Sequence, residues 1–569
     1  MTEIEQEENK NPENTHSKLY QYVENSSNKE ENHQPDAIRR SNGDMNPNDL
    51  ELNNNNNINH EEIPLRVSHI SLIIPDDSIL HWMFCFIVGG LEILMIIFLA
   101  CLFKWDIRND PKFSFKQDNI LYSEINQETE NELNEYYGIF RDINIMVFVG
   151  YGMMHTLIKN YSWGSVVVNI LSIAFSAQFG LIMNLIWENS FRESWKKGVL
   201  NFQSLIQALF NACAVEVSLG SLMGRLSLIQ YLILIIFENI FVSFNFKLCD
   251  SKLKSIDVGG ALYVHTFGTV FGLAIYMVLF CSERKREKFS KINFLRVGDY
   301  FSHLTSFIGI IFIFCYLPSF NTGLTMNNNS RYRALLNTYL SLGGSVISSF
   351  ATSSLFNSGR LILEEIMFGC LSGGVIISGC CSVCIDKWAA ILIGFLCGFI
   401  TIALLHFVKP FLASYGFQDI FNTVSLHGIP GILGAFITPM MIGDLHRRIK
   451  KPHDYHFIFL SDMERDNQIQ AGVQLGAIFI TFGIAFVSGI AVGYLMKIST
   501  CGKIEEHLND SEFFANDENV HPFFKNQINN DINEENIGQP SFLEEHHDEE
   551  RRDSDYLNRG EQPSINNNL

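Results

Sequence analysis

The sequence predicts an all-α, polytopic membrane protein with about twelve transmembrane helices and an inverted repeat. Three observations lead to this fold class. Hydrophobic residues make up 47% of the chain and charged residues only 18%, against about 25% charged residues in an average globular protein. The apolar residues gather in long runs between two polar ends. The mean hydropathy of +0.10 is therefore an average over a strongly apolar middle region and two polar ends. Two segments of the apolar region also share one motif, which predicts the repeat.

The apolar runs are long enough to cross a bilayer as helices, which takes about 20 mostly apolar residues, and they are too long for barrel strands. Several runs are rich in small residues, as at 218–224, 341–349 and 370–379, and small residues let transmembrane helices pack closely. The twelve predicted spans are 81–103, 143–159, 163–187, 203–223, 226–246, 258–281, 303–320, 334–356, 361–384, 387–408, 420–441 and 472–496.

Both ends of the chain are acidic. Residues 1–78 contain 6 basic and 16 acidic residues, residues 499–569 contain 5 and 17, and the region between them has a net charge of +2. Segments rich in Asn, Glu, Asp and Ser bury too little apolar area to offset their ordering entropy. We therefore expect disordered tails at 1–78 and 499–569 around a transmembrane domain at 79–498. The polar start also predicts that no cleavable signal peptide is present.

Composition excludes two classes of protein and bears on orientation. A nucleic-acid binder needs a concentrated basic face, and a secreted scaffold needs Cys at framework spacings, whereas most of the twelve Cys lie in apolar runs.

An even number of spans places both termini on one side. We expect that side to be the cytoplasm, because long acidic tails seldom cross a membrane, although the basic residues of the short loops favour the opposite orientation.

The shared motif joins an aspartate to a histidine. The segments DVGGALYVH at 257–265 and DIFNTVSLH at 419–427 each start with Asp, carry His eight residues later and continue into closely spaced glycines. They lie 162 residues and five predicted span-to-span steps apart. Because five is odd, the two helices are expected to cross the membrane in opposite directions, which is typical of an inverted repeat.

The spacing places both histidines near the bilayer midplane. Asp is a favoured helix N-cap, and eight residues of helix rise about 12 Å into a hydrocarbon core about 30 Å thick. A single histidine there is more often a core residue that hydrogen-bonds a neighbour. Two histidines at matched positions of inverted copies favour a shared functional site, formed by His265 and His427.

Two midplane imidazoles suit the passage of a small neutral molecule. A neutral imidazole has one donor and one acceptor, so a pair in an apolar channel can bind something like ammonia while it repels a cation. A zinc site needs three or four ligands, and no Cys or carboxylate lies nearby in sequence. No nucleophile for hydrolysis is offered either, so we expect no metal, no cofactor and no enzymatic activity.

Longer motifs carry a family resemblance. Between about 81 and 497 the chain resembles the Rh branch of the ammonium transporter family. The matching motifs are NIMVFVGYGMMHTLIKNYSWGSVVVN at 144–169, D-x-GG-(x)4-HTFG at 257–268, LPSFN at 317–321, NTYLSLGGS at 337–345 and D-(x)7-HG-x-PG at 419–431. The resemblance implies a homotrimer in which each subunit of eleven or twelve spans has its own pore. Its first span, 81–103, resembles the additional N-terminal helix of eukaryotic Rh proteins.

The resemblance assigns roles to the shared motif. His265 and His427 resemble the twin histidines of the family's pore. Asp257 and Asp419 resemble the aspartates that orient the two helices carrying them.

The resemblance also implies a gate. Phe210 and Phe320 resemble the stacked phenylalanines that close the outer end of the pore, and Asn321 follows Phe320 as in the family. The chain departs from the family at Leu209 and at 245–246, where relatives often carry acidic residues that attract cations to the outer vestibule.

Several polar residues inside the spans have no assigned role. Glu216 is unexpected there, and it faces either a neighbouring helix or a wet cavity. His155, His303 and His406 are expected to be helix-interior or interfacial residues, and Cys381 and Cys384 to be packing residues.

The sequence therefore predicts a channel for ammonia in the lipid bilayer, in the plasma membrane by resemblance. Ammonium would lose its proton near the outer phenylalanines, and ammonia would pass the two histidines. Net transport of ammonium and conduction of carbon dioxide stay open as alternatives, and so does a non-conducting membrane sensor or scaffold that signals through its tails.

Overall fold

All twelve predicted spans overlap helical segments in the computed structural model, and in the described residues none contains a strand apart from the last residue of the first span. The described residues are 78–106, 130–280, 298–325, 327–415, 417–448 and 466–498, together with Leu508 and Asp510. The predicted N-terminal tail lies outside them, as does the C-terminal tail apart from these two residues.

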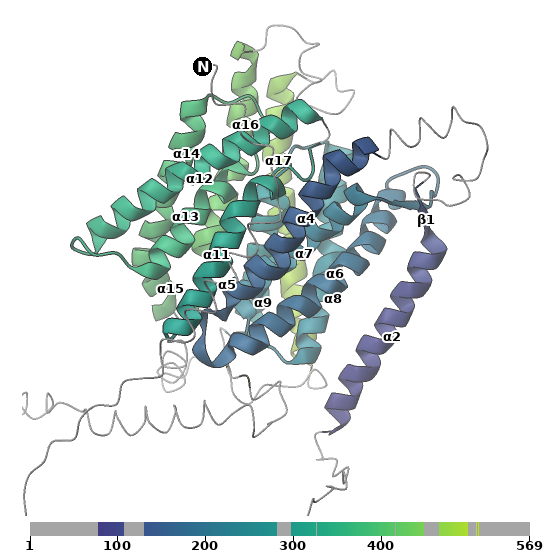
Figure 1. Ribbon diagram of the computed structural model, residues 1–569. Coiled ribbons are helices and arrows are strands. Elements are labelled where there is room, and N and C mark those ends of the chain that lie inside the picture. Colours follow the sequence, from purple (N-terminus) through teal and green to yellow (C-terminus); the bar gives the residue numbers. More distant parts are fainter. Residues whose placement is uncertain are drawn as a thin grey trace, which may run out of the picture. The chain divides into compact units, whose positions relative to one another are not determined.

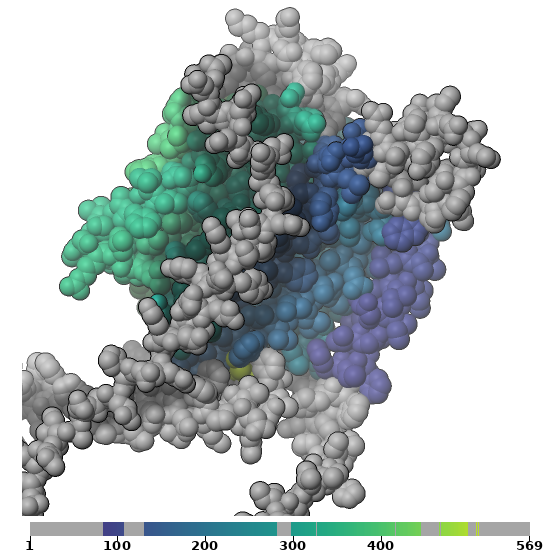
Figure 2. Space-filling view, in the orientation of Figure 1, coloured from purple at the N-terminus to yellow at the C-terminus, as the bar shows by residue number. Residues whose placement is uncertain are grey.

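Helix α2 (Ser78–Leu102) forms the first span and lies at one edge of the helices that follow (Figure 1). It packs against α6 (Ser162–Ser190). Its apolar side chains Phe86, Ile93 and Ile96 are exposed, and α2 lies open on the face that Figure 2 shows. An exposed apolar helix of this length is the surface that lipid would cover.

The second span consists of short helical pieces. These are η2 (Leu133–Tyr137), α4 (Gly138–Ile145), η3 (Met146–Tyr151), α5 (Gly152–Met154) and η4 (His155–Leu157), followed by η5 (Lys159–Tyr161) before α6. The π-helical and 3₁₀ turns η3 and η4 change the direction of the side chains at the end of this span, where Tyr151 and His155 lie.

The next spans complete the first half of the repeat. They are α7 (Phe202–Leu222), α8 (Leu228–Lys247) with η6 (Leu248–Leu253), and η7 (Ala261–Thr266) with α9 (Phe267–Phe280). Capping boxes explain where two of these helices begin. Asn201 pairs with Ser204 at the start of α7, and Ser227 pairs with Gln230 at the start of α8.

The second half contains six further spans. They are α11 (Tyr300–Phe320), α12 (Asn328–Phe356), α13 (Leu363–Ile377), α14 (Lys387–Ala403) with η8 (Leu404–Val408) and α15 (Lys409–Ser414), η9 (Val424–Gly428) with α16 (Ile429–Arg448), and α17 (Asn467–Met496). Asp299 and Asn327 accept backbone N–H bonds at the starts of α11 and α12.

Small residues hold α12, α13 and α14 together. A Cβ on Gly394 of α14 would overlap the Ser341 carbonyl of α12, and a Cβ on Gly344 of α12 would overlap the Ile391 carbonyl of α14. A Cβ on Gly373 of α13 would also overlap the Ser341 carbonyl. The small-residue runs predicted to bring helices close do so here.

Nine helices in the described residues are long and apolar enough to cross a membrane. The other three predicted spans differ for physical reasons. The second span is broken into short pieces, α12 is rich in Ser and Asn, and α13 has only 15 residues. The prediction of one helix over 361–384 is wrong at its end, because turns follow α13 over 378–382.

Two features were not predicted. Strand β1 (Phe103–Trp105) pairs in parallel with β2 (Gly198–Leu200), a small addition to the predicted all-α fold. Leu508 and Asp510, predicted to lie in a disordered tail, contact the helices. The Leu508 N–H donates to the Gly224 carbonyl (2.8 Å), and the Asp510 carboxylate accepts the N–H groups of residues 163 and 164 at the start of α6.

Candidate transport pore

Asp257 anchors the π-helical turn that carries His265. Its Oδ2 accepts the backbone N–H groups of Leu262 and Tyr263, both at 2.8 Å. Gly260, just before the turn, has φ +78°, a conformation in which glycine is strongly favoured. The carboxylate therefore satisfies N–H groups that the start of a helix leaves without partners.

Asp419 anchors the matching turn that carries His427, with a different geometry. Its Oδ1 accepts the N–H of Thr423 (2.8 Å) and its Oδ2 accepts the N–H of Val424 (2.7 Å). Asn422 takes the left-handed conformation here (φ +55°), which Asn tolerates better than most residues. Both copies of the motif thus use an aspartate and a left-handed residue to start a π-helical turn.

His265 and His427 meet face to face. Their Nδ1 atoms lie 3.1 Å apart, and their rings are nearly parallel, with centroids 5.0 Å apart. Both residues are buried, with exposed fractions of 1% and 6%. The Nε2 atom of each ring has no hydrogen-bond partner in the part of the chain that the structure describes.

The contact between the two Nδ1 atoms constrains the protons on the rings. A hydrogen bond there needs one Nδ1–H donor and one Nδ1 acceptor, so at least one imidazole is neutral. If both are neutral, one Nε2 is an acceptor and the other is a donor. The pair then offers one donor and one acceptor to a small molecule beside it.

Phe210 of α7 and Phe320 of α11 stack next to the histidines. Their ring centroids are 4.1 Å apart with an interplanar angle of 10°, and the Phe320 centroid is 6.5 Å from that of His265. Gly323 gives the stack its room, because a Cβ there would come within 2.9 Å of the Phe210 ring. The stack leaves no space for a molecule between the two rings.

Asn321 fixes the end of α11 that carries Phe320. Its Nδ2 donates to Thr338 Oγ1 of α12 (3.1 Å) and to the Gly374 carbonyl of α13 (3.0 Å). A Cβ on Gly259 would lie 2.7 Å from Asn321 Oδ1, so the loop before His265 comes close to this amide. Asn321 therefore holds three elements of the site in register.

Aromatic and polar groups continue beyond His427. The Tyr151 ring stacks on His427 with centroids 6.1 Å apart, and His155, one turn further on, lies 6.0 Å from Tyr151. The edge of Phe421 packs against His155 at 4.9 Å. His155 is fully buried, and its Nδ1 lies 3.8 Å from Glu216 Oε2.

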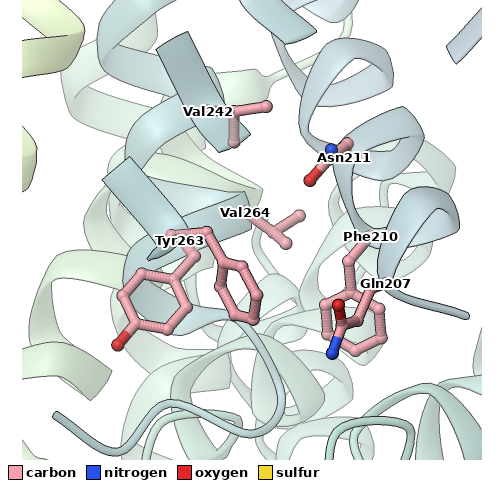
Figure 3. A pocket seen from close by; sticks show the side chains of 7 residues that line it. Gln207, Phe210, Asn211, Val242, Tyr263 and Val264 are labelled. Carbon is pink, nitrogen blue, oxygen red and sulfur yellow. The ribbon is translucent and has the colours of Figure 1, made fainter. Parts of the chain in front are cut away.

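A small apolar cavity lies on another side of Phe210. It is lined by Gln207, Phe210, Asn211, Val242, Phe246, Tyr263 and Val264. Tyr263 and Phe210 lie on opposite sides of the space, with Val264 between them (Figure 3). Neither His265 nor His427 lines this cavity, although α7 and the turn that carries His265 both contribute to its lining.

The structure brings the predicted site residues together. Leu209, which stands where relatives often carry an acidic residue, is buried, and Lys247, next to the 245–246 position, pairs with Glu188 at 3.1 Å. Glu216 faces neighbouring helices. Tyr151 and its place against His427 were missed, and their only sequence signal was the i, i+4 spacing from His155.

Comparison with known proteins agrees with this fold. The family model described as Ammonium Transporter Family matches residues 113–515. Ammonium transporter Rh type C of Rattus norvegicus is 30% identical over 428 residues, which cover 73% of this chain and 82% of that protein. Ammonium transporter Rh type B of Takifugu rubripes is 30% identical over 426 residues, which cover 74% and 88%.

Solved structures show the same fold. The Rh50 channel of Nitrosomonas europaea is similar with a TM-score of 0.56 and 23% identity, over 72% of this chain and 99% of that one. Saccharomyces cerevisiae Mep2 is similar with a TM-score of 0.51 and 15% identity, over 65% and 86%. This chain is an integral, multi-pass membrane protein that belongs to the Ammonium Transporter Family, within its Rh branch.

Proposed function

We propose that this chain conducts ammonia through a pore in which the stacked phenylalanines come first and the two histidines follow. Ammonium reaches Phe210 and Phe320, loses its proton there, and passes His265 and His427 as ammonia. The observation that carries this proposal is the contact between the two Nδ1 atoms, which leaves one Nε2 donor and one Nε2 acceptor in buried surroundings.

The physical case rests on the cost of moving charge into this site. Burying an unpaired ion costs several kcal/mol or more, and the described residues around the twin histidines include no carboxylate that contacts either ring. Ammonia is neutral, has three N–H donors and one lone pair, and can bond to both Nε2 atoms in turn. Protonation of both imidazoles would place two positive charges close together, and the same repulsion between like charges opposes the entry of a cation.

The remaining site residues act as positioning residues in this proposal. Asp257 and Asp419 set the turns that carry the histidines, and Asn321 sets the end of α11 that carries Phe320. We further propose a homotrimer in the plasma membrane, with the transmembrane domain at 79–498 and both tails in the cytoplasm. In the proposed steps the only covalent change is the transfer of a proton from ammonium. The chain therefore needs no cofactor and is not an enzyme.

The test compares flux and current in proteoliposomes. Ammonia flux is followed by the internal pH after a concentration jump, and charge movement is followed on a supported membrane. In His265→Ala or His427→Ala the remaining ring loses its partner, so flux should fall. In His265→Asp or His427→Asp a carboxylate favours a cation, so transport should become more current-like.

The outcomes separate this proposal from its alternatives. If both aspartate variants match the parent protein in flux and in current, the two histidines do not line the conduction path. A parent protein that carries no flux at all would favour a sensor or scaffold. Flux of carbon dioxide that survives both alanine variants would favour gas passage by another route.

A further inference from the structure

A second group of ionisable side chains lies buried beyond His427. We call it the acid–histidine cluster, and it consists of His155 of η4, Asn169 of α6, Glu216 of α7 and Glu238 of α8. All four side chains are buried. Asn169 Nδ2 donates to Glu216 Oε2 (2.6 Å), and His155 Nδ1 lies 3.8 Å from the same oxygen. Glu238 Oε1 lies 2.5 Å from the hydroxyl of Ser218, which follows Glu216 by two residues on α7.

The cluster contains more unpartnered polar atoms than a structural network should. Buried polar groups in folded proteins nearly always have a hydrogen-bond partner. Here both ring nitrogens of His155, Glu238 Oε2 and Asn169 Oδ1 have none in the described residues, while the hydroxyl of Ser172 in α6 lies beside the Glu216 carboxyl. A purely structural set would be satisfied or replaced by apolar groups, because unsatisfied buried carboxyls are costly.

Protons explain how the cluster exists in this setting. Ser218 Oγ lies 2.7 Å from the Gly268 carbonyl, which can only accept, and 2.5 Å from Glu238 Oε1. A hydroxyl has one hydrogen, so a hydrogen bond between Ser218 and Glu238 needs a proton on Glu238. Among the described residues no Lys or Arg forms an ion pair with either glutamate, and an ionised carboxylate without a cationic partner is costly to bury.

His155 and Glu216 together can hold one exchangeable proton. Among the described residues, His155 is the basic side chain that contacts Glu216. The pair is neutral either as protonated Glu216 with neutral His155 or as ionised Glu216 with charged His155. The 3.8 Å gap between them exceeds a hydrogen bond, and a side-chain rotation or one water closes it.

The cluster is connected to the twin histidines by a row of rings. His427 stacks on Tyr151 at 6.1 Å, and Tyr151 lies 6.0 Å from His155. Among the described residues, Cys213 also faces this row, and its Sγ lies 3.6 Å from the Tyr151 hydroxyl.

We propose that His155 and Glu216 form a proton-binding site beside the pore, which receives, by way of the hydrogen-bonded pair His265–His427, the proton that ammonium releases at the stacked phenylalanines, so that part of the transport carries charge. This inference rests on the proposed conduction of ammonia. The step is balanced. Ammonium and the anionic His155–Glu216 pair give ammonia and the neutral, protonated pair, which then releases its proton to water.

The experiment uses two isosteric variants and a matched control. Glu216→Gln and His155→Gln remove one partner each and keep the shape of the side chain. The control is Glu365→Gln, because Glu365 also faces a histidine, His406, at 3.5 Å, but His406 is partly exposed and lies outside the row of rings. Each full-length protein is reconstituted in proteoliposomes and given ammonium pulses.

The first readout is the ratio of current to ammonia flux. Losing a proton-transfer group typically slows a step by about 100-fold or more. We therefore expect current to fall on the order of 100-fold in Glu216→Gln and in His155→Gln, while neutral ammonia flux continues. Glu365→Gln should keep the parent ratio.

The second readout does not depend on transport. Infrared difference spectra across a pH titration should show the carbonyl stretch of a protonated carboxyl that disappears in Glu216→Gln and titrates at a different pH in His155→Gln. The inference is overturned if that band is the same in parent and Glu216→Gln, or if the variants keep the parent ratio of current to flux. A parent without flux would overturn the proposed conduction, while the carboxyl band would still decide whether Glu216 binds a proton.

Discussion

The two aspartates that start the π-helical turns should respond differently to one substitution. At Asp257 both backbone N–H groups donate to Oδ2, and Oδ1 has no partner in the described residues. At Asp419 one N–H donates to Oδ1 and the other to Oδ2. An asparagine has one carbonyl oxygen and one NH₂ group, so it can replace Asp257 and keep both bonds. At Asp419 its NH₂ group must face a backbone N–H.

The difference can be estimated from the lost bonds. A hydrogen bond to a charged group contributes about 1.5–3 kcal/mol and one to a neutral group about 0.5–1.5 kcal/mol, so Asp257→Asn should cost the difference on two bonds. Asp419→Asn weakens one bond, loses the other and leaves a buried N–H unsatisfied, which adds roughly 1–3 kcal/mol. The extra cost falls on the turn that orients His427.

The assay is thermal denaturation of the purified protein in detergent, together with ammonia flux in proteoliposomes. Asp419→Asn should lose more thermal stability and more flux than Asp257→Asn, and the alanine variant at each site sets the lower limit. Equal losses at the two sites, or a larger loss at Asp257, would refute the reasoning from the bond patterns.

Three further predictions concern single contacts. Phe320→Ala should remove half of the stack and admit bulkier amines, and unchanged transport together with unchanged inhibition by such amines would show that the stack is not the gate. Gly394→Ala should destabilise the protein by about 1–3 kcal/mol, because its methyl group would overlap the Ser341 carbonyl, whereas Gly343→Ala has open space and should be neutral in the same thermal assay. Asp510→Ala should lower thermal stability by about 0.5–2 kcal/mol, because it removes the acceptor for two N–H groups at the start of α6, and an unchanged melting curve would count against that contact.

Local pattern was enough to predict most of the fold and the twin histidines. Apolar runs of span length located the helices. The Asp-to-His spacing, repeated in two segments with opposite predicted directions, was enough to predict that His265 and His427 lie close together. The site beyond His427 could not be predicted in this way. Tyr151 and His155 lie one turn apart in the second span, but they meet Glu216 only because that span packs against α7. A lone His or Glu in an apolar run has no partner visible in the sequence.

The same limit applies elsewhere in the fold. The turns after α13 and the pairing of β1 with β2 depend on what packs against them, since each segment alone is compatible with other structures. The docking of Leu508 and Asp510 was missed because an acidic segment by composition predicts disorder, and composition does not show that one carboxylate caps a distant helix.

The π-helical turns at both histidines make the length of these segments as important as their composition. A π-helical turn accommodates one residue more than an α-helical turn, and His265 N–H accordingly donates to the carbonyl five residues earlier. Deleting one residue from either turn would restore α-helical geometry and swing every later side chain by about 100° around the helix axis, since an α-helix has 3.6 residues per turn. A one-residue deletion on one side would therefore separate the two imidazoles.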